Sequence, residues 1–278
     1  MKIGLAAIGI GGGARPATLR AIASAADATG FATLWMGQHV VLFDRHDSKY
    51  PYSERGEFSV PATTDWLDPF VALSAAAAVT SHIRLGTGIC LVPQHNPLIL
   101  AKQVASLDRL SDGRFALGIP FARRAKRTRE YVALMRRLWS EDVTTFHGEF
   151  AHVDGVRSFP KPVGRLPVIL GGESRAALGR AAEYGDGWYG FNLSPEEATE
   201  RIAVLRSLLQ RRQRDPAAFE IVVAPFTKPV RPADLARYHA AGVDEVTIVA
   251  TPPRDESRVT AWIGDLANEW VRPAGTLA

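Results

Sequence analysis

Short apolar runs alternate with longer amphipathic stretches along the whole chain. The short runs are typical of buried strands, and the longer stretches have the apolar spacing of helices that cover a sheet on one face. We predict strands at residues 3–10, 33–37, 84–92, 114–119, 167–170, 187–191, 219–224 and 245–250. We predict helices at residues 17–30, 68–80, 97–111, 122–139, 174–184, 195–212, 232–241 and 257–270.

This alternation predicts a (β/α)8 barrel. Each helical crossover returns the chain to the same end of the sheet, so repeated strand–helix units form parallel strands. An open, doubly wound sheet is the alternative. No linker or change of composition divides the chain, so we predict one domain over residues 1–278. A polar, aromatic and proline-rich excursion interrupts the alternation at about 39–67, and "TFHGEFAHVDG" at 145–155 predicts a small hairpin.

The first strand is followed by glycines that allow a direct test of a dinucleotide-binding fold. Gly9, Gly11 and Ala14 satisfy G-x-G-x-x-A. That fingerprint also needs an acidic residue at the end of the second strand, to hold a ribose hydroxyl. The second strand ends in "MGQH" at 36–39, without a carboxylate. The glycines are therefore better explained as an ordinary loop.

The composition of the chain fits some classes of protein and excludes others. The 278 residues are 46% hydrophobic, which suits a folded domain, and carry a net charge of +4, which fits a small anionic ligand or no charged ligand at all. No apolar run approaches the roughly 18 residues of a membrane span. A single cysteine, Cys90, excludes an internal disulfide and suits a reducing compartment. The apolar stretch after Lys2 is interrupted by glycines and predicts a strand rather than a signal peptide. We therefore expect a cytoplasmic protein.

The most basic segment is "RRAKRTRE" at 123–130. Its arginines, Arg123 and Arg124 included, avoid the apolar face of the predicted helix, as on the solvated side of an outer helix. No aromatic residues are interleaved with them to stack on bases. Nucleic-acid binding is therefore not expected.

In a (β/α)8 barrel the functional groups lie at the carboxyl ends of the strands and in the loops that follow. His39 follows the second strand, and a histidine there can hydrogen-bond a ligand or move a proton near neutral pH. "GGES" at 171–174 opens a helix after the fifth strand. Its glycines allow close backbone approach, and a serine N-cap leaves N–H groups for a phosphate. A structural histidine and a plain capped turn are the alternatives.

Metal binding has little support in the sequence. There is no H-E-x-x-H motif and no cysteine or histidine spacing typical of zinc. His147, Glu149 and His152 lie close in sequence, but strand alternation is expected to put His152 on the opposite face from the other two. We predict no metal site.

Several segments together resemble the luciferase-like monooxygenase superfamily, and most of all its actinobacterial deazaflavin-dependent oxidoreductases. They are "GFATLWMGQHVV", "DPFVALSAAAAVTSHIRLGTGICLVPQHNPLILAKQVASLDRLSDGRFALGI", "HVDGVRSFPKP", "LGGESRAALGRAAEYGDGWYGF" and "AAGVDEVTIV". The resemblance implies a (β/α)8 barrel that binds coenzyme F-420 or FMN at the carboxyl ends of the strands. It also implies hydride transfer through the deazaflavin, or oxygen activation through reduced flavin.

By position in these motifs, the resemblance implies that His39 lies beside the reactive ring of the cofactor. Gln38 stands where the family usually has an aspartate; it can hydrogen-bond the cofactor but cannot act as a base. Thr87 and Gly88 fall where the third strand lies against the isoalloxazine, often with a strained peptide bond. His95 stands where many relatives have an arginine.

The same resemblance implies that Gly171, Gly172 and Ser174 bind the cofactor phosphate. One departure from the family is large: about a dozen residues of a glycine-rich pocket loop are missing near 119–121, where Pro120 offers no N–H donor. A barrel that binds a small ligand without redox chemistry is therefore the alternative to an oxidoreductase.

We thus expect an oxidoreductase that uses coenzyme F-420, with FMN as the second choice, and a small organic substrate. Tyr50, Tyr52 and Trp66 of the excursion are expected to line the substrate pocket. A homodimer is a further expectation from the resemblance.

Overall fold

The computed structural model describes residues 1–44, 50, 56, 60–120 and 125–277. The predicted roles of Tyr52, Arg123 and Arg124 lie outside the described residues. None of the helices in the described part of the chain has the length and apolar content needed to span a membrane.

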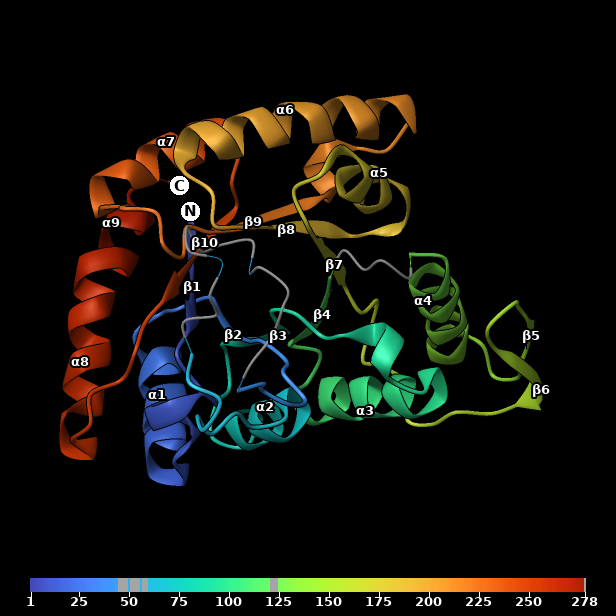
Figure 1. Ribbon diagram of the computed structural model, residues 1–278, viewed down its shortest axis with the longest axis horizontal. Helices are drawn as coiled ribbons and strands as arrows, with labels where there is room; N and C mark the ends of the chain where they lie inside the picture. The colour runs from blue at the N-terminus through green and yellow to red at the C-terminus, as the bar shows by residue number, and fades with distance from the viewer. Residues whose placement is uncertain (45–49, 51–55, 57–59, 121–124, 278) are drawn as a thin grey trace.

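Eight parallel strands close into a barrel in the order β1-β10-β9-β8-β7-β4-β3-β2, with helices around the outside (Figure 1). The predicted (β/α)8 barrel is confirmed, and the open sheet is wrong. The strands are β1 (Lys2–Ala6), β2 (Thr33–Met36), β3 (Arg84–Thr87), β4 (Phe115–Ile119), β7 (Val168–Gly171), β8 (Gly187–Phe191), β9 (Glu220–Ala224) and β10 (Glu245–Val249).

The outer helices follow the predicted pattern, and several begin with proline at the first helical position, where its missing N–H costs nothing. Asp68 caps α2, because its side chain accepts hydrogen bonds from the N–H groups of Phe70 and Val71. The helices are α1 (Pro16–Ala28), α2 (Pro69–Ala77), α3 (Pro97–Leu110), α4 (Ala125–Ser140), α5 (Arg175–Tyr184), α6 (Pro195–Arg211), α7 (Leu235–Ala241), α8 (Val259–Leu266) and α9 (Arg272–Gly275).

Two strands are shorter than predicted. The first ends at Ala6 and the third at Thr87, although apolar residues continue in both segments. Beyond Thr87, Cys90 and Val92 are fully buried. Their apolar character therefore reflects burial in a loop and not strand pairing.

The predicted hairpin is confirmed, and it lies outside the barrel beyond α4 (Figure 1). It consists of β5 (Thr144–His147) and β6 (His152–Val156). The prediction that His152 faces away from His147 is wrong. The chain reverses between the two residues, so they are direct cross-strand partners on one face of the hairpin. Alternation of side chains holds only within a single strand.

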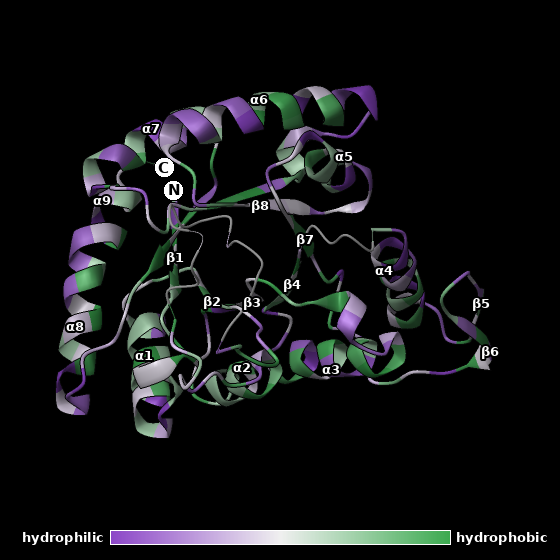
Figure 2. Ribbon diagram, viewed as in Figure 1, coloured by the Kyte–Doolittle hydropathy of each residue, from purple (hydrophilic) through white to green (hydrophobic). Residues whose placement is uncertain are grey.

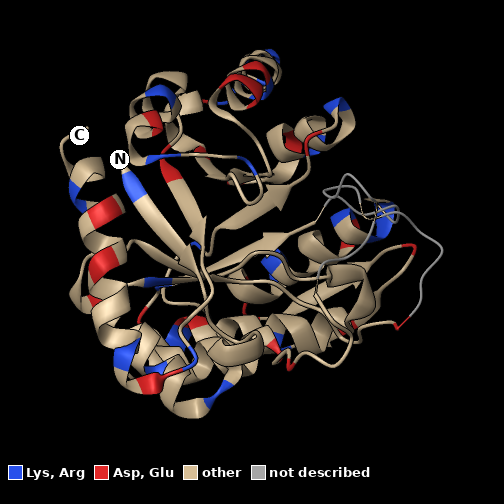
Figure 3. Cartoon of the chain, turned by 60° about the vertical axis from the view of Figure 1, so that its left-hand side comes forward, with Lys and Arg blue, Asp and Glu red and all other residues tan. Residues whose placement is uncertain are grey.

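Apolar side chains fill the barrel and the layer between barrel and helices, and the outward faces of the helices are hydrophilic (Figure 2). Charged residues gather on those outer helices (Figure 3). On α4, Arg129 pairs with Glu183 at 2.8 Å, and Arg136 pairs with Asp186 at 2.7 Å. Arginines that are already paired with carboxylates fit the predicted solvated helix rather than a site for nucleic acid.

One carboxylate lies inside the barrel. Glu245, at the start of β10, is fully buried and accepts hydrogen bonds from Thr33 Oγ1 at 2.7 Å and from Trp35 Nε1 at 2.6 Å. Gly4 makes room for it, because a Cβ at that position would lie 2.3 Å from the Glu245 carboxylate. Burial raises the pKa of Glu245, and the nearby Arg84 guanidinium opposes that rise.

We expect the Glu245→Gln substitution to change how stability depends on pH. A glutamate whose pKa is higher in the folded protein stabilises it fully below the ordinary value of 4.5 and loses that contribution as pH rises through the folded pKa. Glutamine stays neutral, and the Thr33 hydroxyl can turn from donor to acceptor. The free energy of unfolding of the wild type, minus that of Glu245→Gln, should therefore fall as pH rises above 4.5.

Urea denaturation across a pH series measures this difference. Glu269→Gln, which removes an exposed carboxylate instead of a buried one, is the control. A difference that stays constant or grows with pH would contradict the assignment of a raised pKa to Glu245.

Candidate active site

The candidate site residues predicted from sequence gather at the carboxyl end of the barrel. In the barrel order, β2, β3, β4 and β7 are consecutive neighbours. Met36 at the end of β2 is in register with Thr87 at the end of β3, and Ile119 at the end of β4 is in register with Leu170 of β7. The segments that begin at Gln38, Gly88 and Gly171 therefore leave the barrel on one side of the same mouth.

Gln38 joins the loops that follow β2 and β3. Its side chain is 5% exposed, and Oε1 accepts a hydrogen bond from the Leu91 N–H at 2.8 Å. Nε2 lies 2.9 Å from Nε2 of His95. The amide is thus hydrogen-bonded within the protein. The contact of Gln38 with a cofactor stays a prediction.

His39 follows β2 at the mouth, and the residue is exposed. It lies against the Trp66 ring, with 4.4 Å between the ring centroids. The Trp66 indole N–H donates to the Gly37 carbonyl at 3.0 Å, and this bond ties the end of the excursion to β2. Partial dehydration by these neighbours lowers the pKa of His39 from its ordinary value of 6.5. The imidazole is therefore mainly neutral near pH 7 and is able to accept a proton.

Thr87 and Gly88 have different surroundings, although they are adjacent. Thr87 is fully buried, and its hydroxyl donates to the Gly118 carbonyl and accepts from the Gly118 N–H, each at 2.9 Å. Gly88 is partly exposed at the mouth, and its peptide bond to Ile89 is cis. Gly88 can thus face a ligand directly, while Thr87 joins β3 to β4 beneath it.

The loop at 171–174 is held in place from β8. The Trp188 indole N–H donates to the Gly172 carbonyl at 2.9 Å, and the Glu173 carboxylate accepts from the Phe191 N–H at 3.0 Å. Gly172 has φ +105°, a conformation that side chains strongly disfavour. Ser174 caps α5 by accepting from the Ala177 N–H at 3.2 Å.

The remaining N–H groups in the first turn of α5 have no partner inside the helix and are oriented along its positive end. A fixed loop before such a turn can bind a phosphate. Glu173 and Trp188 hold this loop, yet no motif in the sequence distinguishes them. Their function depends on which strand lies beside β7, and only the barrel order supplies that information.

Residues 120–124 connect β4 to α4, and 121–124 lie outside the described residues. β4 ends at Ile119 and α4 begins at Ala125, between the strands that lead to Gly88 and to Gly171. In this position a loop would form a wall between the two predicted cofactor contacts. The glycine-rich pocket loop that is predicted to be missing near 119–121 would lie in this part of the mouth.

A separate cavity of about 560 Å³ opens at the amino-terminal end of the barrel, lined in part by Lys2, Arg84, Glu220 and Asp244. Its central polar feature is the paired contact of the Arg84 guanidinium with both carboxylate oxygens of Glu220, at 2.6 and 2.8 Å. Groups at this end of a (β/α)8 barrel contribute to stability, whereas active sites lie at the other end. We therefore place the candidate active site at the carboxyl end.

Comparison with known proteins gives a match over almost the whole chain. The family model described as luciferase-like monooxygenase matches residues 4–268. An uncharacterized protein of Mycobacterium tuberculosis is 33% identical over 273 residues, covering 91% of this chain and 94% of that protein.

Two further comparisons concern proteins of described activity. An F-420-dependent hydroxymycolic acid dehydrogenase of Mycobacterium tuberculosis is 26% identical over 250 residues, which cover 82% of this chain and 65% of that protein. The solved structure of an F-420-dependent secondary alcohol dehydrogenase, in complex with an F-420-acetone adduct, superimposes with a TM-score of 0.75 at 16% identity. The superposition covers 99% of each chain.

Proposed function

Because the chain belongs to the luciferase-like monooxygenase family, we propose that it is an oxidoreductase that transfers a hydride between coenzyme F-420 and a small organic substrate. The observation that carries this proposal is the convergence of His39, Gly88 and the 171–174 loop on one mouth of the barrel. The 26% identical F-420-dependent dehydrogenase supports the choice of cofactor and of hydride transfer.

The residues at the mouth fit such a cofactor. The loop at Gly171 and Gly172 and the first turn of α5, capped by Ser174, would hold its phosphate through backbone N–H groups. Gly88, which is partly exposed, would lie against the face of the ring. When bound, a deazaflavin supplies a ring that accepts or gives a hydride.

His39 would hold or move the proton that accompanies the hydride. Oxidation of an alcohol, for example, removes a hydride from carbon and a proton from the hydroxyl group. The lowered pKa of His39 keeps its ring neutral and ready to accept that proton. Gln38 would act indirectly, because it fixes the loop at Leu91 and the position of the neighbouring His39.

Titration of the purified protein with F-420 and with FMN, followed by fluorescence quenching or anisotropy, tests the proposal. We expect F-420 to bind in the micromolar range. If FMN binds more tightly than F-420, FMN becomes the proposed cofactor, and an FMN-dependent monooxygenase of the same family becomes the better proposal. If neither binds at tens of micromolar, the oxidoreductase proposal fails. A ligand-binding barrel without redox chemistry, to which the missing loop near 119–121 points, then becomes the better proposal.

The same titration tests the phosphate loop when it is repeated with Gly172→Val. A β-branched residue at φ +105° is strained by about 1–3 kcal/mol, so the loop should relax away from its binding conformation. We expect the F-420 dissociation constant to rise about tenfold or more. Gly164→Val is the matched control, because a Cβ there would meet no atom within 4 Å. If the two variants bind F-420 with equal affinity, the 171–174 loop does not contact the cofactor.

A cytoplasmic location and a homodimer remain predictions. The substrate is proposed only as a small organic molecule, and Tyr50 and Trp66 of the excursion are the described side chains expected to contact it. Trp66 is half-buried beside His39, in a position suited to that contact.

A further inference from the structure

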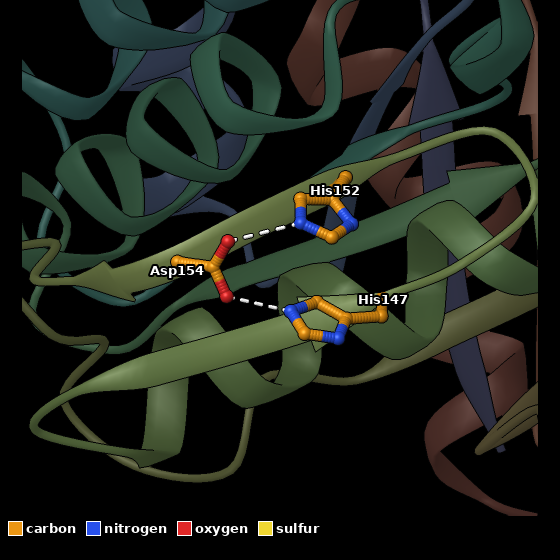
Figure 4. Close-up of side chains that lie close together, drawn as sticks. All are labelled: His147, His152 and Asp154. Atoms are coloured by element: carbon orange, nitrogen blue, oxygen red, sulfur yellow. Dashed lines mark hydrogen bonds and ion pairs between the residues drawn. The ribbon is translucent and has the colours of Figure 1, made fainter.

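Three metal-ligating side chains converge on the outer face of the β5–β6 hairpin (Figure 4). His147 Nε2 lies 2.6 Å from Asp154 Oδ1, and His152 Nε2 lies 2.9 Å from Asp154 Oδ2. The two imidazole rings are stacked, with 4.0 Å between centroids and 6° between planes. We propose that His147, His152 and Asp154 form a binding site for a divalent transition metal ion of the zinc class.

The hairpin itself explains this convergence. His147 and His152 are directly opposite each other across the two strands, where side chains on one face lie close together. Asp154 is two residues beyond His152 on the same strand, and alternation puts it on the same face. The opposite face carries Phe146 and the buried Val153, which pack against the hydrophobic core. The three polar groups are thus directed to solvent, and each side chain is more than half exposed.

The backbone that carries these ligands is firmly held. The Glu130 carboxylate of α4 accepts hydrogen bonds from three consecutive N–H groups of the hairpin turn, those of Glu149, Phe150 and Ala151, at 2.7–2.8 Å. A Cβ at Gly148 would lie 2.3 Å from the same carboxylate, so this contact also requires glycine. A turn fixed in this way keeps the two strands in register and limits the entropy that the protein loses when a metal binds.

The donor set matches the chemistry of zinc. Two imidazole nitrogens and one carboxylate oxygen are ligands that Zn²⁺ binds at about 2.0–2.2 Å, with a tetrahedral arrangement and water in the remaining position. Such ligand atoms lie about 3.4 Å apart around a shared ion. Here the three atoms lie within 4.8 Å of one another, so small rotations of exposed side chains complete the site. Hard cations such as Mg²⁺ prefer oxygen ligands and should bind poorly.

Calorimetric titration of the full chain with Zn²⁺ at neutral pH tests the proposal. We expect one Zn²⁺ per chain, and with Co²⁺ the visible absorption of a four-coordinate site. His152→Ala and Asp154→Asn should each weaken Zn²⁺ binding by more than about tenfold, since even partners outside the coordination sphere contribute about 10–100-fold. Zinc should also raise the melting temperature of the wild type but not that of His152→Ala.

His82→Ala is the matched control. His82 is also an exposed histidine beside a carboxylate, 3.6 Å from Asp27, but among the described residues no second histidine joins this pair in a possible metal site. Zn²⁺ affinity should not change in that variant. If the wild type binds Zn²⁺ no more tightly than His152→Ala does, the three residues form only a hydrogen-bonded cluster and the proposal is overturned. The hairpin lies outside α4, away from the barrel mouth, so this outcome is independent of the cofactor titration (Figure 1).

Discussion

Gly118→Ala is expected to destabilise the protein by about 3 kcal/mol or more. A Cβ on residue 118 would lie 1.9 Å from the carbonyl oxygen of Thr87 on the neighbouring strand. Overpacking in a core costs about 1–3 kcal/mol when side chains can move aside. Here the obstacle is backbone, and the Thr87 hydroxyl bonds both the N–H and the carbonyl of Gly118, so neither strand can move without losing these bonds.

Urea denaturation followed by circular dichroism measures the change. Gly179→Ala, in the middle of α5, is the control, because a Cβ there meets no atom within 4 Å and alanine is the better helix former. That variant should match or exceed the wild type in stability. If Gly118→Ala proves insoluble, Gly171→Ala provides a second comparison, since its Cβ would meet only ordinary contacts at 3.5 Å or more. Stability of Gly118→Ala within about 1 kcal/mol of the wild type would contradict the close strand contact.

His39→Ala is expected to lower turnover by a factor of about 10²–10⁴, the usual contribution of a positioned acid or base. This expectation rests on the proposed function. The assay follows F-420 absorbance with the best substrate from a panel of alcohols and their ketones. Binding of F-420, measured separately, should change little, because the phosphate loop at 171–174 lies on a different strand.

A second variant separates proton transfer from simple orientation. Glutamine in His39→Gln can hydrogen-bond a substrate but cannot accept a proton, so it should be almost as slow as alanine. In the wild type the rate of alcohol oxidation should fall as pH drops through the His39 pKa, which lies below 6.5. If His39→Ala retains full turnover, or the fall with pH survives the substitution, His39 is not the proton acceptor.

Much of the fold follows from the chain because the pattern is local and repeated. Each buried strand is a short apolar run, and each outer helix has one apolar face. Because strands and helices alternate along the chain, only a few sheet topologies are possible. Asp68 as an N-cap is predictable for the same reason, since capping involves residues only two or three positions apart. Strand ends such as that at Thr87 are not predictable in this way, because a buried loop is as apolar as a strand.

The candidate site was predictable in part. A residue that follows a strand, such as His39 or Gly172, is placed at the mouth by the barrel alone. What each side chain contacts there depends on the neighbouring strand. The hydrogen bonds between Thr87 and Gly118, and between Gln38 and Leu91, therefore could not be predicted from the sequence. The face of His152 was missed for a related reason, because it depends on where the hairpin turns.

The hydrogen bond that holds the 171–174 loop has a consequence for substitutions in the core. The Trp188 side chain is fully buried, yet its indole N–H donates to the Gly172 carbonyl. A truncation of Trp188 would therefore open a cavity in the apolar layer and, at the same time, release the loop that is proposed to bind the phosphate. Loss of stability and loss of affinity for an anionic ligand would then appear together in one variant.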